Sequence, residues 1–271
     1  KSGYIETGRL FPTDLGSPQG SAISPTICNM VLDGLEVQIR KKYHKTKRDG
    51  KAYFPKVNFI RYADDFIVTG ESRELLEAGV LPIIREFLSE RGLELSEEKT
   101  VITHIEDGFD FLGCNIRWYK EKLLTKPSKK NYKAIVNKIR GIIKQNPSMK
   151  QEDLIRKLNP VIRGWVNFQK YNVSSQAFDR FDFDVWRCLW RWCKRRHPKK
   201  SHKWIAKKYV RRVGTRNWTF SVNMADSFEL HLIYATDTKI VRWLKTKSEA
   251  TPFDERFTEY FEDRDTKRML R

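Results

Sequence analysis

The sequence predicts an α+β fold, in which an antiparallel sheet with helices is followed by an all-helical module and a small basic segment. Three observations support this prediction. Helical, hairpin and further strand patterns follow one another along residues 1–124. Apolar residues then recur at helical spacing from Lys126 onward. Finally, 53 Lys and Arg against 34 Asp and Glu give a formal net charge of +19.

The composition excludes several classes of protein. Eight Trp and sixteen Phe supply apolar surface for a core, which disordered chains lack. No apolar run has the roughly 18–20 residues of a membrane span, and four scattered Cys do not build a disulfide scaffold. We therefore expect an intracellular protein, cytoplasmic in a bacterium or organellar, with no signal peptide after Lys1. The charge surplus predicts an anionic partner, most simply nucleic acid and not a membrane.

The beginning of the chain predicts loop and then helix. Residues 1–20 are expected to be extended chain and loop, because Pro and Gly punctuate them. A helix is expected from Ser24, a capping residue followed by Pro25, to about Tyr43. It is expected to leave through a basic loop at residues 45–51.

Two short apolar runs, residues 57–62 and 66–69, predict a β-hairpin. Only Ala63, Asp64 and Asp65 separate the runs, so two carboxylates are expected at the hairpin tip. At ~4 Å and an effective dielectric of ~20, such a pair costs about 4 kcal/mol in repulsion. A cation removes that cost, and Mg²⁺ prefers oxygen ligands. The two aspartates are therefore candidate metal ligands, and a solvated turn is the alternative.

The pattern after the hairpin predicts a helix and then more strands. An amphipathic helix is expected over residues 71–92, interrupted at Pro82 and capped by Gly92. Strands are expected over residues 93–105 and 109–124.

From Lys126 onward the sequence predicts a basic helical module. Residues 187–216 carry thirteen Lys or Arg and no acid, a density that predicts binding to a polyanion. We assign the interleaved Trp190 and Trp192 to the core. Pro147, Pro160 and Pro198 are expected to end helices. The expected helices are residues 126–144, 150–158, 160–172 and 178–196.

Four strings in order resemble reverse transcriptases. Residues 59–66, Phe-Ile-Arg-Tyr-Ala-Asp-Asp-Phe, resemble their Tyr-x-Asp-Asp motif. Residues 16–25, Gly-Ser-Pro-Gln-Gly-Ser-Ala-Ile-Ser-Pro, followed by Asn29, are similar to the element that precedes it. Residues 95–100 and 111–113 resemble the next two elements.

Later strings narrow the family to group II intron-encoded proteins. Residues 162–168, 190–192 and 195–198 resemble their thumb, or maturase, domain. Residues 214–220 and the run to Glu262 resemble the DNA-binding region that follows. The resemblance implies a partial palm at 1–124, a thumb/maturase domain at 125–212, a DNA-binding region at 213–250 and an acidic linker toward an endonuclease domain at 251–271.

The resemblance implies an RNA-directed DNA polymerase that also acts as an RNA-splicing maturase. The implied partners are group II intron RNA, an RNA template with its DNA primer, target DNA and deoxynucleoside triphosphates. Asp64 and Asp65 would bind Mg²⁺ in a two-metal site. We propose that Lys99 protonates or neutralises the pyrophosphate leaving group, with a surface lysine as the alternative.

The resemblance also implies contacts with the substrates. Gln19 and Gly20 would line the nucleotide site, and Tyr62 and Ala63 would lie near the primer terminus. Phe111, Leu112 and Gly113 would belong to the primer grip. Phosphate contacts are expected from the basic residues of the helical module and its C-terminal extension. These are Lys126, Lys129, Lys130, Lys133, Arg163, Lys194, Arg195, Arg196, Lys199, Lys200, Lys203, Lys207, Lys208, Arg211 and Arg212.

The sequence departs from the family pattern at one catalytic position. Relatives use a third aspartate on an upstream strand, and Asp14 lies too close to the Pro-Gln-Gly element to supply it. We therefore expect a carboxylate outside this chain to complete the metal site. One alternative function is a non-enzymatic RNA-binding splicing cofactor. A reverse transcriptase of a defence or diversity-generating system is another, which residues 162–220 argue against. Oligomeric state is left open.

A zinc site is a further alternative that the sequence raises. Cys188, Cys193, His197 and His202 resemble a zinc pattern, but the loop between the ligand pairs of a zinc finger is missing. On a continuous helix Cys188 and His197 would face opposite sides. We therefore reject zinc.

Overall fold

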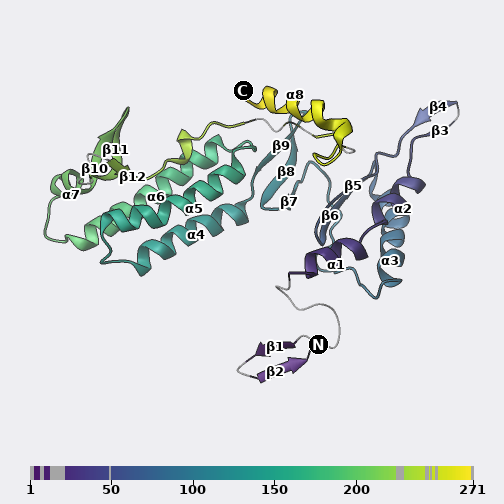
Figure 1. Cartoon of the computed structure of the whole chain (residues 1–271), viewed down its shortest axis with the longest axis horizontal. Coiled ribbons are helices and arrows are strands. Elements are labelled where there is room, and N and C mark those ends of the chain that lie inside the picture. Colours follow the sequence, from purple (N-terminus) through teal and green to yellow (C-terminus); the bar gives the residue numbers. More distant parts are fainter. Residues whose placement is uncertain are drawn as a thin grey trace. The chain divides into compact units, whose positions relative to one another are not determined.

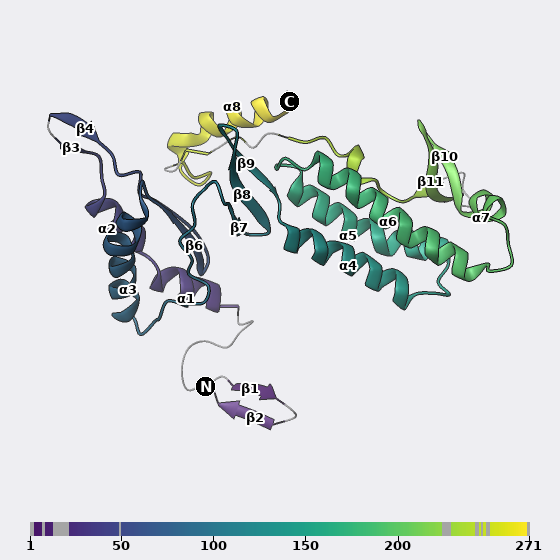
Figure 2. The same ribbon diagram turned by 180° about the vertical axis from the view of Figure 1, so that it is seen from behind.

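The computed structural model describes residues 3–6, 9–12, 22–48, 50–223, 229–241, 244, 246–247 and 250–269. The chain forms two compact units, Lys1–Ile102 and Thr103–Arg271 (Figures 1 and 2). Helices and short antiparallel sheets make up both, which confirms the predicted α+β class. The functional boundaries expected at 124/125, 212/213 and 250/251 stay predictions. Among the described helices, none combines the length and apolarity needed to cross a membrane.

The first unit contains three two-stranded antiparallel sheets and a set of short helices. Strands β1 (Gly3–Glu6) and β2 (Arg9–Pro12) pair within the segment that was expected to be extended chain and loop. Strands β3 (Thr46–Arg48) and β4 (Lys51–Tyr53) pair within the segment that was expected to be a basic loop. Strands β5 (Asn58–Tyr62) and β6 (Asp65–Thr69) form the predicted hairpin, so that prediction is confirmed.

The first predicted helix is divided in the structure. Helix α1 (Ser24–Val31) ends before a turn, and α2 (Leu35–Lys42) begins after Gly34, whose φ is +90°. The left-handed conformation at Gly34 is one that glycine adopts at little cost. The turn lets both Leu32 and Leu35 enter the core, so burial accounts for the break.

The second helix continues through the proline that was expected to interrupt it. A π-helical segment, η1 (Leu75–Val80), leads directly into α3 (Leu81–Ser89). The Leu81 N–H donates to the Leu76 carbonyl, and this wider turn comes just before Pro82. Pro82 lies in the first turn of α3, where a missing N–H costs little, so the predicted interruption is a change from π-helix to α-helix and the helical path continues.

The helix ends at a glycine cap as predicted, but the segment that follows is not a strand. Gly92 has a φ of +66°, and the Leu93 N–H donates to the Leu88 carbonyl at 2.9 Å, which is a glycine-ended helix cap. Residues 93–105 contain turns and irregular chain, so the strand prediction was wrong. Arg85 on α3 forms an ion pair with Glu97 at 2.8 Å, which ties this segment to the helix.

The second unit begins with an antiparallel meander and continues into helices. Strands β7 (Phe109–Phe111), β8 (Cys114–Tyr119) and β9 (Lys122–Pro127) pair in sequence order. Helices α4 (Lys129–Gln145), α5 (Gln151–Gln169) and α6 (Ser175–Arg196) lie side by side (Figures 1 and 2). After α7 (His202–Tyr209), strands β10 (Val210–Val213), β11 (Arg216–Asn223) and β12 (Glu229–His231) form a second meander. The short η2 (Ala235–Asp237) and η3 (Glu255–Phe257) precede α8 (Thr258–Met269).

Helix α5 runs unbroken through Pro160, so the break predicted there was wrong. A proline inside a helix removes one backbone hydrogen bond and costs about 3 kcal/mol. Leu154, Leu158 and Ile162 are fully buried on the face of α5 that enters the core, on both sides of the proline. Their burial offsets the cost and keeps the helix continuous.

We expect Leu158→Ala to lower the free energy of unfolding of the second unit by about 2–5 kcal/mol, because it leaves a cavity in the core. All eight Trp lie in this unit, so tryptophan fluorescence during urea denaturation reports on it alone. The neighbouring exposed Lys157→Ala is the control and should change the value by less than about 0.5 kcal/mol. Equal midpoints for the two variants would contradict this packing.

Candidate active site and nucleic-acid interface

The two candidate metal ligands lie at the tip of the β5–β6 hairpin. Tyr62 and Asp65 form the last pair of the ladder, and Ala63 and Asp64 make the two-residue turn between them. All four residues are exposed, Tyr62 by 65%. Among the described residues, none forms a hydrogen bond or ion pair with the side chain of either aspartate. Two adjacent carboxylates are therefore presented to solvent with free oxygen ligands.

An arginine that the sequence reasoning did not single out braces this turn. Ala63 has a φ of +54°, a left-handed conformation that costs a non-glycine residue about 1–2 kcal/mol. Arg61 Nη1 donates to the Ala63 carbonyl at 3.0 Å and to Asn29 Oδ1 on α1 at 2.9 Å. The contact fixes the turn against α1. Both residues belong to the recognised strings, but only the structure joins them.

The hairpin is anchored below the tip by apolar packing. Phe59 on β5 is buried, and its ring stacks on Phe66 of β6 with centroids 5.5 Å apart. Val57, just before β5, lies in the same core, together with α2 and α3. A rigid base therefore supports the exposed carboxylates.

Three further predicted positions belong to the first unit, and the structure describes one of them. Gln19 and Gly20 lie outside the described residues. Lys99 is exposed in a turn whose Lys99 and Thr100 N–H groups donate to the Ser96 carbonyl at 3.2 and 3.0 Å. The proposed role of Lys99 stays a prediction.

The predicted primer-grip residues form the β7–β8 turn of the second unit. Phe111 pairs with Cys114, and Leu112 and Gly113 are the two central residues of the turn. Their φ angles are +48° and +76°, the left-handed pair that a tight two-residue hairpin uses. Leu112 is partly exposed at 40%. The turn therefore exposes one apolar side chain, and its glycine allows a close approach to the backbone.

A partly buried network of amide groups holds this turn against the helices. The Gly113 carbonyl accepts from the Ser128 N–H at 3.0 Å, and Ser128 caps α4 through the Asn131 N–H. Asn131 Oδ1 accepts from Trp165 Nε1 at 2.8 Å and from Gln169 Nε2 at 3.2 Å, both on α5. A Cβ on Gly113 would lie 2.8 Å from Asn131 Nδ2, so only glycine fits this contact.

The network continues beyond Gln169, which is fully buried. Gln169 Oε1 accepts from Asn172 Nδ2 at 2.8 Å, and the same Asn172 nitrogen lies 3.2 Å from Cys114 Sγ at the start of β8. The buried Ser174 hydroxyl donates to the Gln169 carbonyl at 2.7 Å. Burial raises the pKa of the Cys114 thiol, which suits a packed sulfur rather than a nucleophile.

Most predicted phosphate contacts are exposed in the structure. Lys126 is half-buried, with its Nζ 4.3 Å from the centre of the Tyr119 ring. Lys200 and Lys208 lie over the Trp204 ring, at 5.4 and 5.2 Å from its centre. The exposed members of the set are Lys129, Lys130, Lys133, Arg163, Lys194, Arg195, Lys199, Lys200, Lys203, Lys207, Lys208 and Arg212.

Two arginines of the predicted set are engaged inside the protein. Arg196 Nη1 donates to the Pro147 and Met149 carbonyls, and its guanidinium lies 4.5 Å from the centre of the Trp192 ring. Arg211 Nη1 donates to the Ser221 carbonyl between β10 and β11. These contacts give both residues a structural role that the charge count alone did not reveal.

The residues of the zinc-like pattern have separate packing roles. Cys193 is buried in the core, and burial raises the pKa of its thiol to about 12. His197 Nε2 lies 2.8 Å from the Tyr209 hydroxyl, and the His202 ring packs edge-on against Trp190. Trp192 is buried as predicted, with its Nε1 donating to the Asn146 carbonyl at 2.9 Å.

We expect Gly113→Ala and Gly164→Ala to have opposite effects on the second unit. Ala at 113 must adopt a left-handed φ and displace Asn131, so it should lower the free energy of unfolding by at least about 1–2 kcal/mol. Gly164 lies exposed within α5 with open space around it, so Ala there should raise the free energy by up to about 1 kcal/mol. Urea denaturation measures both, and equal effects would contradict the tight turn.

Comparison with known protein families finds a matching family for each of two segments of the chain. The family described as "Reverse transcriptase (RNA-dependent DNA polymerase)" matches residues 4–116, and "Group II intron, maturase-specific domain" matches residues 132–210. The first match contains the hairpin tip, and the second contains most of α4 together with α5, α6 and α7.

Individual relatives agree with this assignment. "Putative COX1/OXI3 intron 2 protein" of Saccharomyces cerevisiae is 26% identical over 43% of this chain and 19% of its own length. "Protein YkfC" of Escherichia coli (strain K12) is 28% identical over 42% of this chain and 35% of its own length. "Group II intron-encoded protein LtrA" of Lactococcus lactis is 24% identical over 56% of this chain and 34% of its own length.

The chain therefore spans between about a fifth and about a third of the length of these relatives. Its two matched segments follow each other in the order that the sequence motifs predicted. The chain therefore contains a segment of the reverse transcriptase family followed by a group II intron maturase-specific domain.

Proposed function

We propose that this chain is the part of an intron-encoded protein that carries the catalytic hairpin for RNA-directed DNA synthesis and the RNA-binding maturase module. The observation that carries the proposal is the pair of exposed carboxylates at the braced tip of the β5–β6 hairpin. An apolar base and the Arg61 contact hold the backbone of the turn that carries Asp64 and Asp65. Such rigidity is what a nucleotidyl-transfer site requires.

The chemistry of the donor set fits Mg²⁺. Asp64 and Asp65 offer hard oxygen ligands, and they can leave coordination positions open for substrate phosphates. When bound, the metal would stabilise charge on the attacking and leaving oxygens. In the reaction the primer 3′-hydroxyl attacks the α-phosphate of a deoxynucleoside triphosphate, and pyrophosphate leaves. A carboxylate outside this chain would complete the ligand set.

The helical module supports the maturase part of the proposal. Twelve of the fifteen predicted phosphate-binding side chains are exposed there and in the adjoining segment through Arg212. Their density favours structured intron RNA and the template–primer duplex as partners, with target DNA as a further one. A non-enzymatic splicing cofactor is the second candidate, because the maturase helices have their own core within the second unit.

A variant series in the full-length protein tests the catalytic assignment. Asp64→Asn and Asp65→Asn should each lower the rate of primer extension on an RNA template by at least about 100-fold, because an amide binds Mg²⁺ far less well than a carboxylate. Asp33→Asn, at an exposed position after α1, is the control and should extend normally.

The same variants separate the two candidate functions. We expect intron splicing to survive Asp64→Asn and Asp65→Asn, because the basic module is unchanged. Normal extension by both variants would contradict a catalytic role for the hairpin. Absence of extension by the unaltered protein, with splicing intact, would favour the non-enzymatic cofactor.

A further inference from the structure

An open hollow beside α6 is lined by four aromatic and five polar or charged residues, and it has no role in the function proposed so far. Its volume is about 420 Å³, within the range of sites for small ligands. Phe183 and Trp218 are 60% and 53% exposed, which is unusual for such large apolar rings. The lining residues are Asp179, Asp182, Phe183, Trp186, Arg216, Asn217, Trp218, Tyr234 and Thr236.

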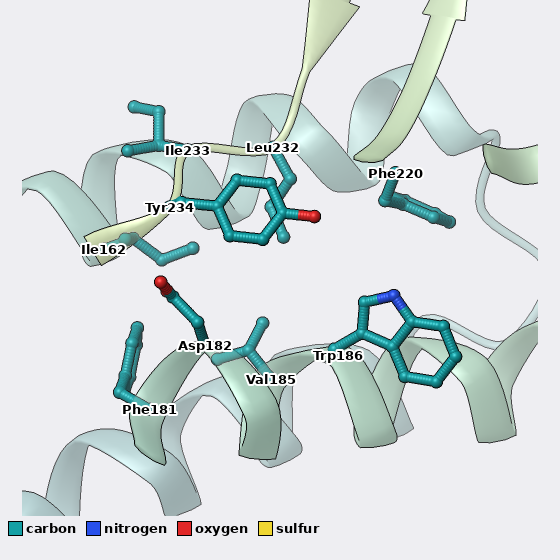
Figure 3. Close-up of a pocket in the computed structure, with 9 residues that line it drawn as sticks. All are labelled: Ile162, Phe181, Asp182, Val185, Trp186, Phe220, Leu232, Ile233 and Tyr234. Atoms are coloured by element: carbon teal, nitrogen blue, oxygen red, sulfur yellow. The ribbon is translucent and has the colours of Figure 1, made fainter. Parts of the chain in front are cut away.

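The floor of the hollow is fixed by hydrogen bonds. Asp182 on α6 accepts from the Ala235 and Thr236 N–H groups at 2.7 and 3.0 Å, so its carboxylate holds η2 in place. Burial raises the pKa of Asp182, although these hydrogen bonds oppose the rise. Figure 3 shows Asp182 and Trp186 pointing from α6 toward the segment that carries Tyr234. The enclosed cavity drawn there is only about 10 Å³, so ligands of any size must use the open side.

One wall of the hollow is an arginine that lies over an aromatic ring. The Arg216 guanidinium lies 4.4 Å from the centre of the Tyr234 ring. Its Nη2 donates to Thr236 Oγ1 at 2.9 Å, and its Nε donates to Asp237 Oδ1 at 3.0 Å. These contacts pre-organise the wall, so binding there would order few additional side chains.

The other wall contains Trp186 and Trp218, which belong to a cluster of three tryptophans. Trp186 and Trp190 stack with centroids 5.2 Å apart, and Trp218 on β11 packs against both, at 6.0 and 6.2 Å. Trp186 and Trp190 support Trp218 from behind, and more than half of the Trp218 surface remains free. A flat aromatic ligand could stack on that free face.

The charged residues in and around the hollow indicate what kind of ligand it can bind. Asp179 and Asp182 would repel a phosphate inside it. Outside it, α6 carries the exposed basic residues Arg187, Arg191, Lys194 and Arg195, and the Arg187 guanidinium lies 5.5 Å from the centre of the Phe183 ring. A ligand with a neutral flat group inside the hollow and an anionic backbone outside it fits this arrangement. An unpaired nucleotide has both features.

We propose that this hollow binds an unpaired base of single-stranded nucleic acid, which stacks on Trp218 and Phe183 while its backbone lies along the basic surface of α6. The proposal rests on the nucleic-acid binding proposed above and adds a site to it. Asp179 and Asn217, which also line the hollow, provide an acceptor and an amide for the edge of the base.

The test measures the affinity of the full chain for a fluorescent single-stranded RNA and for a duplex of the same length. Trp218→Ala should weaken single-strand binding by about 5- to 150-fold, because stacking on one aromatic side chain supplies that much. Trp218→Phe should retain most of the affinity. The salt dependence should stay unchanged, because no phosphate contact is removed.

Matched variants make the result specific. Phe183→Ala removes an exposed ring that supports no neighbour in the tryptophan cluster, so it should weaken single-strand binding without unfolding the site. Trp118→Ala, at a 42% exposed tryptophan on β8 away from the lining, is the control and should bind normally. Circular dichroism of each variant establishes that the helices remain.

Three outcomes would overturn the proposal. They are unchanged single-strand binding by both Trp218→Ala and Phe183→Ala, an equal loss for the duplex, and an equal loss in Trp118→Ala. A failure of the polymerase assignment appears in the Asp64→Asn comparison instead, so the two proposals fail separately.

Discussion

A single amide oxygen, Asn131 Oδ1, joins the elements on which the second unit depends. It accepts from Trp165 and Gln169 on α5, while Asn131 itself lies in the first turn of α4 and against Gly113 of the β7–β8 turn. Buried polar groups are costly when unpaired, so each partner in such a network constrains the others. The turn that resembles the primer grip is therefore a rigid extension of the helical bundle, not a separate loop.

Packing also determines how the second unit accommodates its many charged residues. Apolar side chains of α4, α5 and α6 face one shared core, and the lysines and arginines of these helices project outward. Arg196 and Arg211 are exceptions that stabilise the backbone, and Asp182 uses its charge to hold η2. Basic residues left without acidic partners need a polyanion to offset their repulsion, which links the packing to the proposed RNA binding.

Sequence reasoning predicted the hairpin and the basic helices because their signals are local. Apolar runs interrupted by two aspartates, and helical spacing after Lys126, need no tertiary information. It failed where distant contacts decide the outcome. Pro160 does not break α5 because Leu158 and Ile162 are buried on either side of it, and residues 93–105 are held in turns rather than in a sheet. The roles of Arg61 and Asn131 were likewise invisible, because their partners lie 32 and 34 residues away.

A double-mutant cycle between Asn131→Ala and Trp165→Phe tests the central claim most directly. Trp165→Phe removes the indole N–H and keeps an aromatic ring in the core, so the cycle isolates the hydrogen bond to Asn131. The network predicts a coupling of about 0.5–3 kcal/mol in the free energy of unfolding, measured by urea denaturation. Effects that add to within about 0.3–0.5 kcal/mol would contradict a network that holds the turn and the helices together.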